Sequence, residues 1–119
     1  SSSNMSKDDI EKAVKEAEQY AAQDKKMKED VETRNQADQM VYQSEKTLNE
    51  MGDKIPAEDK SKVQAGIDKL KETLKGTDTA AIKTATDELT QDFYAVSEKL
   101  YQQAQNDAQA QGGGTDNMP

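Results

Sequence analysis

The stretch "VQAGIDKLKETLKGTDTAAIKTATDEL", residues 63–89, contains two helical patterns separated by a turn. Apolar residues in its first half recur at alternating spacings of four and three, as in a helix with one buried face; they are Val63, Ile67, Leu70 and Leu74. Lys75-Gly76 ends this helix, and Thr77 or Asp78 caps the next one. Because so short a linker makes neighbouring helices antiparallel, the stretch predicts a helical hairpin.

The second helix of the hairpin extends beyond residue 89, because its heptad-like apolar pattern continues. The residues of this pattern are Ile82, Ala85, Leu89, Phe93, Val96, Leu100 and Ala104. After Tyr101 the chain becomes a Gln/Ala tract that runs into glycines. We therefore expect the helix end to fray and residues 106–119 to form a disordered tail.

A much longer helix is predicted upstream of the hairpin. Ser6 is followed three residues later by Asp9, which resembles a capping box, and no Gly or Pro interrupts the chain from there to Met51. Gly52 is expected to be the C′ residue of this helix, and Pro56 to lie in the first turn of the next one.

The apolar stripe of the long helix differs between its two halves. The N-terminal half is thin and carries Ile10, Val14, Ala17, Ala21, Met27 and Val31. The C-terminal half is wider, because Ala37, Met40, Ser44, Leu48 and Met51 lie beside Val41. We therefore predict an all-α fold in which a long N-terminal helix leads into a small antiparallel helical bundle. The expected parts are a flexible lead-in (1–5), the long helix (6–52), a distal bundle (53–105, completed by 37–52) and the tail.

Composition excludes several classes of function. The net charge of −8 argues against a nucleic-acid partner, because binding there needs a basic surface. The chain has no cysteine and no histidine, and no stretch matches a glycine-rich phosphate loop or a calcium loop, so we expect neither an enzyme nor a metal site. No apolar run approaches the ~18 residues of a membrane span.

Because it starts with Ser, we expect the chain to be a piece of a larger protein.

Arg34 and Asp38 are unusual because both lie near the apolar stripe, on the side of Val31 and Val41. One interpretation is a surface ion pair one helical turn apart, which contributes a few tenths of a kcal/mol. The other is a polar latch, in which the helix docks on another surface partly through charge and can be released. Tyr42, one turn beyond Asp38, would belong to the same contact.

Four stretches, found in order between about Ser2 and Gln105, resemble the seventy-kilodalton heat-shock chaperones of the bacterial DnaK type. They are "SKDDIEKAVKEAEQYAAQDKK", "ETRNQADQMVYQSEK", "GDKIPAEDKSKV" and "LKGTDTAAIK". The resemblance implies the α-helical lid of the peptide-binding domain, in a cytoplasmic chaperone. In this family the lid closes over a β-sandwich that holds an unfolded client peptide. ATP is bound by a separate domain, so the resemblance implies no cofactor in this segment.

The resemblance also assigns roles to individual residues. It implies that Asp38 forms the latch to the β-sandwich, that Tyr42 lies beside it, and that Arg34 supports it. Asp24 matches an acidic position that contacts the same subdomain. Tyr42 departs from the imidazole of some relatives, and the family's acidic C-terminal motif is absent, since the chain stops at "GGGTDNMP".

An alternative hypothesis is a stand-alone helical interaction module. Its basis is the stripe of the N-terminal half, from Ile10 to Val31, which has no predicted partner within the chain. We expect this stripe either to pair with a second copy in a homodimer or to fray.

Overall fold

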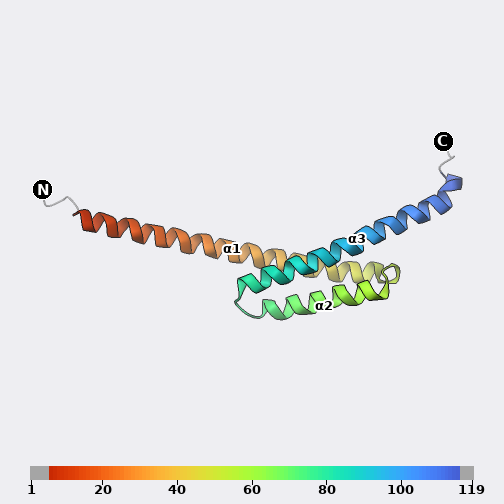
Figure 1. The fold of residues 1–119 in the computed structure, drawn as a ribbon, viewed down its shortest axis with the longest axis horizontal. Helices are drawn as coiled ribbons and strands as arrows, with labels where there is room; N and C mark the ends of the chain where they lie inside the picture. The colour runs from red at the N-terminus through yellow and green to blue at the C-terminus, as the bar shows by residue number, and fades with distance from the viewer. Residues whose placement is uncertain (1–5, 116–119) are drawn as a thin grey trace.

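The computed structural model describes residues 6–115, and side chains as far as Ala110. These residues form α1 (Lys7–Met51), the short 3-10 helix η1 (Gly52–Lys54), α2 (Ala57–Leu74) and α3 (Thr79–Thr115). No strand occurs among the described residues, so the predicted all-α fold is confirmed. Figure 1 shows α1 entering a small bundle in which α2 and α3 run back and forth beside its second half. The predicted lead-in, residues 1–5, lies outside the described residues.

The start of α1 has the predicted cap. The Ser6 hydroxyl accepts a hydrogen bond from the backbone N–H of Asp9 at 3.1 Å, and Asp8 and Asp9 lie in the first turn. The hydroxyl satisfies one of the N–H groups that a helix start leaves without a partner, and the two carboxylates favour the positive end of the helix dipole. From this cap α1 continues without a break to Met51.

The turn between α1 and α2 differs from the predicted glycine stop. Gly52 has φ −54° and ψ −34°, so it remains right-handed and begins η1. The backbone N–H of Ile55 donates to the Gly52 carbonyl at 3.3 Å, and the Ile55 side chain is buried. Pro56, in an extended conformation, then precedes α2 as its N-cap residue. The chain thus leaves α1 through a tightened last turn that Ile55 anchors in the core.

The core lies where the second half of α1, α2 and the first half of α3 meet. Gly66 allows α2 and α3 to approach closely, because a Cβ atom at this position would lie 3.1 Å from Cδ1 of Leu89. Ion pairs between exposed side chains also join α2 and α3, including Lys99 to Asp59 at 2.6 Å. The buried apolar residues come from all three helices and the turn: Ala37, Val41, Leu48, Ile55, Val63, Ile67, Leu70, Ile82, Ala85, Leu89 and Val96.

The structure differs from the prediction at the C-terminal end. We expected a fraying end and a disordered tail from residue 106, but α3 continues to Thr115. Alanine and glutamine dominate residues 102–111, and both are good helix formers, which favours extension of α3 past the bundle. The last four residues of the predicted tail lie outside the described residues.

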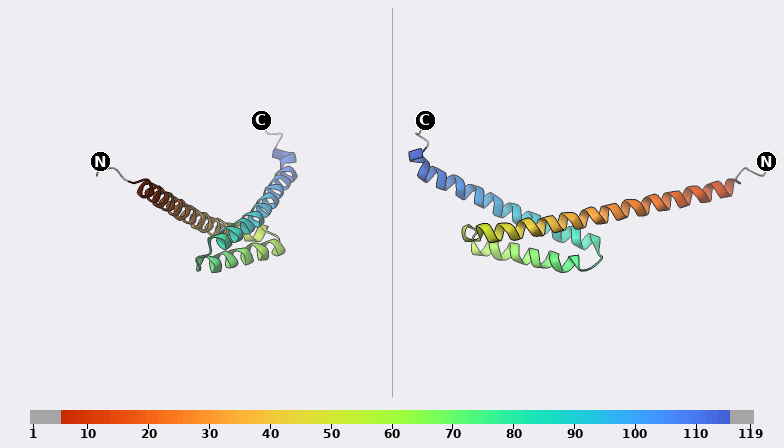
Figure 2. Two further views of the ribbon diagram at one scale, coloured as in Figure 1. Left: turned by 60° about the vertical axis from the view of Figure 1, so that its left-hand side comes forward. Right: turned by 180° about the vertical axis from the view of Figure 1, so that it is seen from behind.

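The molecule is elongated, with principal extents of 90 × 39 × 16 Å. The first half of α1 projects from one end of the bundle, and the last part of α3 projects from the other (Figures 1 and 2). Within residues 6–115, no helix is both long enough and apolar enough to cross a membrane. We call residues 7–33 of α1 the arm.

Candidate docking face of the long helix

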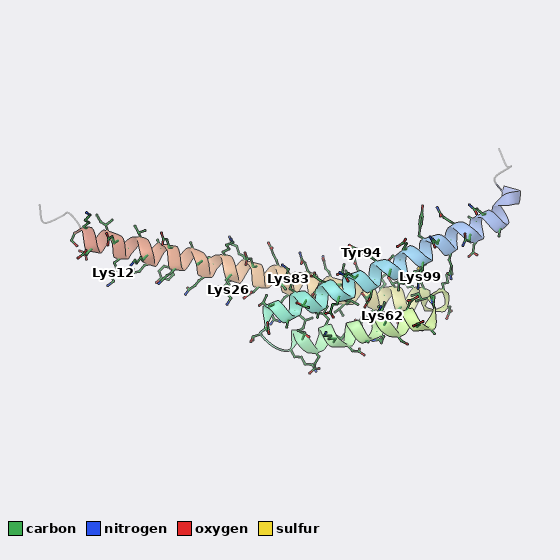
Figure 3. The ribbon with its side chains drawn as sticks, in the orientation of Figure 1. Lys12, Lys26, Lys62, Lys83, Tyr94 and Lys99 are labelled. Carbon is green, nitrogen blue, oxygen red and sulfur yellow. The ribbon has the colours of Figure 1, made fainter. Side chains whose placement is uncertain are left out.

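Among the described residues, no other helix packs against the apolar stripe of the arm. Ile10 and Val14 are each 50% exposed, Met27 is 66% exposed and Val31 57%, while Ala17 and Ala21 are exposed as well. The view with side chains shows the region of Lys12 and Lys26 with no other helix beside it (Figure 3). The stripe that the sequence predicts is therefore present on one helix and is left without a partner among the described residues.

The predicted continuity of the stripe is wrong at Val31 and Val41. Val31 is 57% exposed, whereas Val41 is buried in the bundle with only 9% of its surface exposed. Residues ten apart differ by ~80° around a helix of 3.6 residues per turn, whereas residues seven apart differ by only ~20°. Arg34 is seven residues before Val41, and Asp38 is seven after Val31, so the two charged residues belong to different faces.

The N-terminal part of the arm stripe points away from the face that the bundle covers, whereas Val31 and Asp38 lie only ~80° and ~60° from Val41 around the helix axis. Ala21 and Ala37 differ by ~160° around the helix axis, and Val14 and Ala37 by ~140°. Ala37 is fully buried, since it belongs to the face that the bundle covers. A surface that covers the N-terminal part of the arm stripe must therefore approach α1 from the side away from the bundle.

Arg34 faces the bundle. Its guanidinium donates to the Leu74 carbonyl at 3.1 Å and to the Gly76 carbonyl at 2.6 Å. These carbonyls lie at the C-terminal end of α2, where a helix has unpaired acceptors and a partial negative charge. The interpretation of Arg34 and Asp38 as a simple surface pair is not supported, because no ion pair joins them among the described residues.

The other predicted latch residues lie on the exposed face. Asp24, Val31 and Asp38 are spaced by seven residues and fall within ~40° of one another around the axis. Asp24 and Asp38 are exposed, and Tyr42 is 66% exposed. No hydrogen bond or ion pair within residues 6–110 engages the Asp38 carboxylate. We call Asp24, Val31, Asp38 and Tyr42 the docking face.

Sequence reasoning missed what Arg34 contacts, because its partners lie forty and more residues away in the α2–α3 turn. The spacing of Ala37, Val41 and Leu48 places Ser44 on the wider face of α1, and the structure buries it fully. What the spacing does not indicate is that the Ser44 hydroxyl has no hydrogen-bond partner among the described residues.

A hollow lies between α1 and the start of α3. It is open and polar, and its lining residues are Glu29, Asp30, Glu32, Thr33, Gln36, Thr79, Ala80 and Lys83. No group of three or more His, Cys, Asp or Glu side chains arranged to hold a metal ion occurs in the described part of the chain. The residues of this hollow therefore suggest no particular chemistry.

The arrangement combines a bundle that has its own core with an arm whose apolar stripe is exposed. A model of the Hsp70 protein family matches residues 1–102. The match extends over most of the described structure, including α1, α2 and the part of α3 that packs in the bundle. The chain therefore belongs to the Hsp70 family.

Proposed function

We propose that this chain is the lid of a chaperone's peptide-binding domain, and that it slows the release of unfolded client peptides. Membership of the Hsp70 family supports a chaperone-related role. The observation that carries the finer proposal is the exposed docking face, which extends from the arm, at Asp24 and Val31, to Asp38 and Tyr42 in the next part of α1. In this proposal the arm covers the peptide-binding β-sandwich, and the bundle stiffens the far end of α1.

The docking face fits a reversible contact. Only Val31 and Tyr42 supply apolar surface, and a contact made partly through Asp24 and Asp38 is weaker than a continuous apolar seam. A latch of this kind needs to favour the closed state by only ~1–3 kcal/mol to change its occupancy by one or two decades. Basic or hydrogen-bond-donating loops of the sandwich are the partners that two carboxylates require.

The proposal assigns no catalytic group and no cofactor to the residues of this chain. ATP binding and hydrolysis would belong to a separate domain of the chaperone, which would drive opening of the lid. The partners of the lid are then the β-sandwich directly and the client peptide indirectly, in a cytoplasmic chaperone of the DnaK type.

The test is the rate of peptide release from the intact chaperone carrying Asp38→Ala. We expect release to be about tenfold faster, because a latch contact of ~1–2 kcal/mol is lost, while the helical content stays unchanged. Glu29→Ala is the matched control, because Glu29 is exposed on α1 about 180° away from Asp38. Equal release from the Asp38→Ala variant and the wild type would remove Asp38 from the latch.

A further inference from the structure

We infer that the arm pairs with the arm of a second copy of this chain, antiparallel and in a single register. The inference starts from a heptad seam that includes polar residues as well as the apolar stripe. Its members alternate at spacings of four and three, and all of them are exposed: Ile10, Val14, Ala17, Ala21, Asp24, Lys28, Val31, Asn35 and Asp38. The spacing of its apolar members is that of a coiled-coil seam, and the polar members occupy the same positions of the heptad.

Charge within the seam selects against a parallel pair. In a parallel pair each residue meets its own copy, so Asp24 would face Asp24, Lys28 would face Lys28, and Asp38 would face Asp38. These three like-charge contacts would lie in a seam with only three large apolar residues, Ile10, Val14 and Val31. An antiparallel pair brings different residues together and avoids all three.

One antiparallel register separates the like charges and pairs two of the three large apolar residues, while Ile10 faces Asn35. It places Val14 against Val31 of the second copy, and by symmetry Val31 against Val14. Asp24 and Lys28 then face the small residues Ala21 and Ala17, which leave room for the charged groups to reach water. Lys7 meets Asp38 at each end of the paired region.

The flanks of the seam support the same register. The flanks are the positions on either side of the seam, and an antiparallel pair brings the same flank of both copies together. Glu18 then lies beside Lys25 of the second copy, and Tyr20 lies beside Met27 of the second copy. Glu11 meets Glu32 on the same flank, and this like-charge contact makes the pair weak and reversible.

The two valines that face each other in this register are both accessible to a partner. A shallow hollow lies on the arm around each of them. The first is formed by Ile10, Glu11, Val14, Lys15 and Glu18, and the second by Met27, Lys28, Val31 and Glu32. The bundle leaves the N-terminal part of the stripe accessible, because it covers the opposite side of α1. One arm cannot pair and dock on a β-sandwich at the same time, since both use this face.

The first test is sedimentation equilibrium of the 119-residue chain. We expect a reversible dimer that forms as the concentration rises toward ~1 mM, in keeping with a free energy of association of a few kcal/mol. Glu18→Lys alone or Lys25→Glu alone should weaken the dimer about tenfold, because each creates two like-charge contacts. The double variant restores opposite charges and should return within about twofold of the wild type.

Glu16→Lys and Lys26→Glu are the matched controls, because they make the same changes in charge outside the seam and its flanks; they should change association less than threefold. Circular dichroism of every variant verifies that the helices remain. A chain that stays monomeric, or a double variant no stronger than the single ones, would overturn the inference.

Cysteine cross-linking tests the register independently, because the chain has no cysteine of its own. A mixture of the Val14→Cys and Val31→Cys chains should form a disulfide between the two variants under mild oxidation. Neither variant alone should cross-link comparably, because each introduced thiol then faces a valine. Cross-linking of either single variant at the level of the mixture would indicate another register and overturn the inference.

Discussion

Arg34 and Asp38 are four residues apart, yet they serve different surfaces. The guanidinium of Arg34 holds the carbonyls of Leu74 and Gly76, so it fixes the α2–α3 turn against α1. Asp38 is exposed on the docking face. Arginine suits its position because its planar fork can donate to two carbonyls at once.

Removal of the Arg34 side chain should destabilise the bundle. Arg34→Ala leaves two carbonyls at the end of α2 without their charged donor, and we expect a loss of ~1–3 kcal/mol in the free energy of unfolding. Amide exchange in residues 75–78 should accelerate. Lys28→Ala, which removes an exposed positive charge from the arm, is the control and should have little effect. Equal stability of the two variants would show that the Arg34 hydrogen bonds contribute nothing in solution.

Replacement of Ser44 by alanine should stabilise the folded protein. Its buried hydroxyl lacks a hydrogen-bond partner, whereas the buried hydroxyl of Thr86 donates to the Ile82 carbonyl at 2.7 Å. We expect Ser44→Ala to raise the free energy of unfolding by ~1–2 kcal/mol, because an unsatisfied buried polar group is removed. Denaturant unfolding measures this gain. Ser61→Ala, on the exposed side of α2, controls for the change in helix propensity. A loss of stability in the Ser44→Ala variant would contradict the buried position of the hydroxyl.

At the scale of elements, α2 and α3 approach each other closely at Gly66. We expect Gly66→Val to lower the free energy of unfolding by ~1–3 kcal/mol, because its side chain would press against the fully buried Leu89. Thermal unfolding measures the effect. Gly76→Ala is the comparison, since a Cβ atom there meets only the Thr73 carbonyl oxygen at 3.6 Å. A Gly66→Val variant as stable as the wild type would mean that α2 and α3 lie farther apart.

The helices and most of the core could be predicted from the sequence, because Val63, Ile67, Leu70 and Leu89 follow a local period. The direction in which the arm face points relative to the bundle could not be predicted from the sequence. The spacing predicts one continuous stripe, whereas Val31 is 57% exposed and Val41 is buried, and only the packing of α2 and α3 determines which residues of α1 the bundle covers. The contact of Arg34 is equally hidden, because it depends on how the α2–α3 turn closes against α1.

At the scale of the whole molecule, stability resides in the bundle and not in the arm. Deletion of residues 7–30 should reduce the helical signal in circular dichroism but leave the free energy of unfolding within ~0.5 kcal/mol, because the deleted side chains belong to no core. A deletion extended to residue 36 also removes Arg34 and should destabilise the bundle. If the shorter deletion destabilises the bundle as much as the longer one, the arm contributes to folding.

The central claim is that this chain acts as a lid through the exposed face of its arm. The most direct measurement is the rate of peptide release from the intact chaperone, with this helical segment present and with it deleted. The account predicts much faster release after deletion, since the cover over the peptide is lost. Equal release rates would contradict it and would show that the arm face serves another partner.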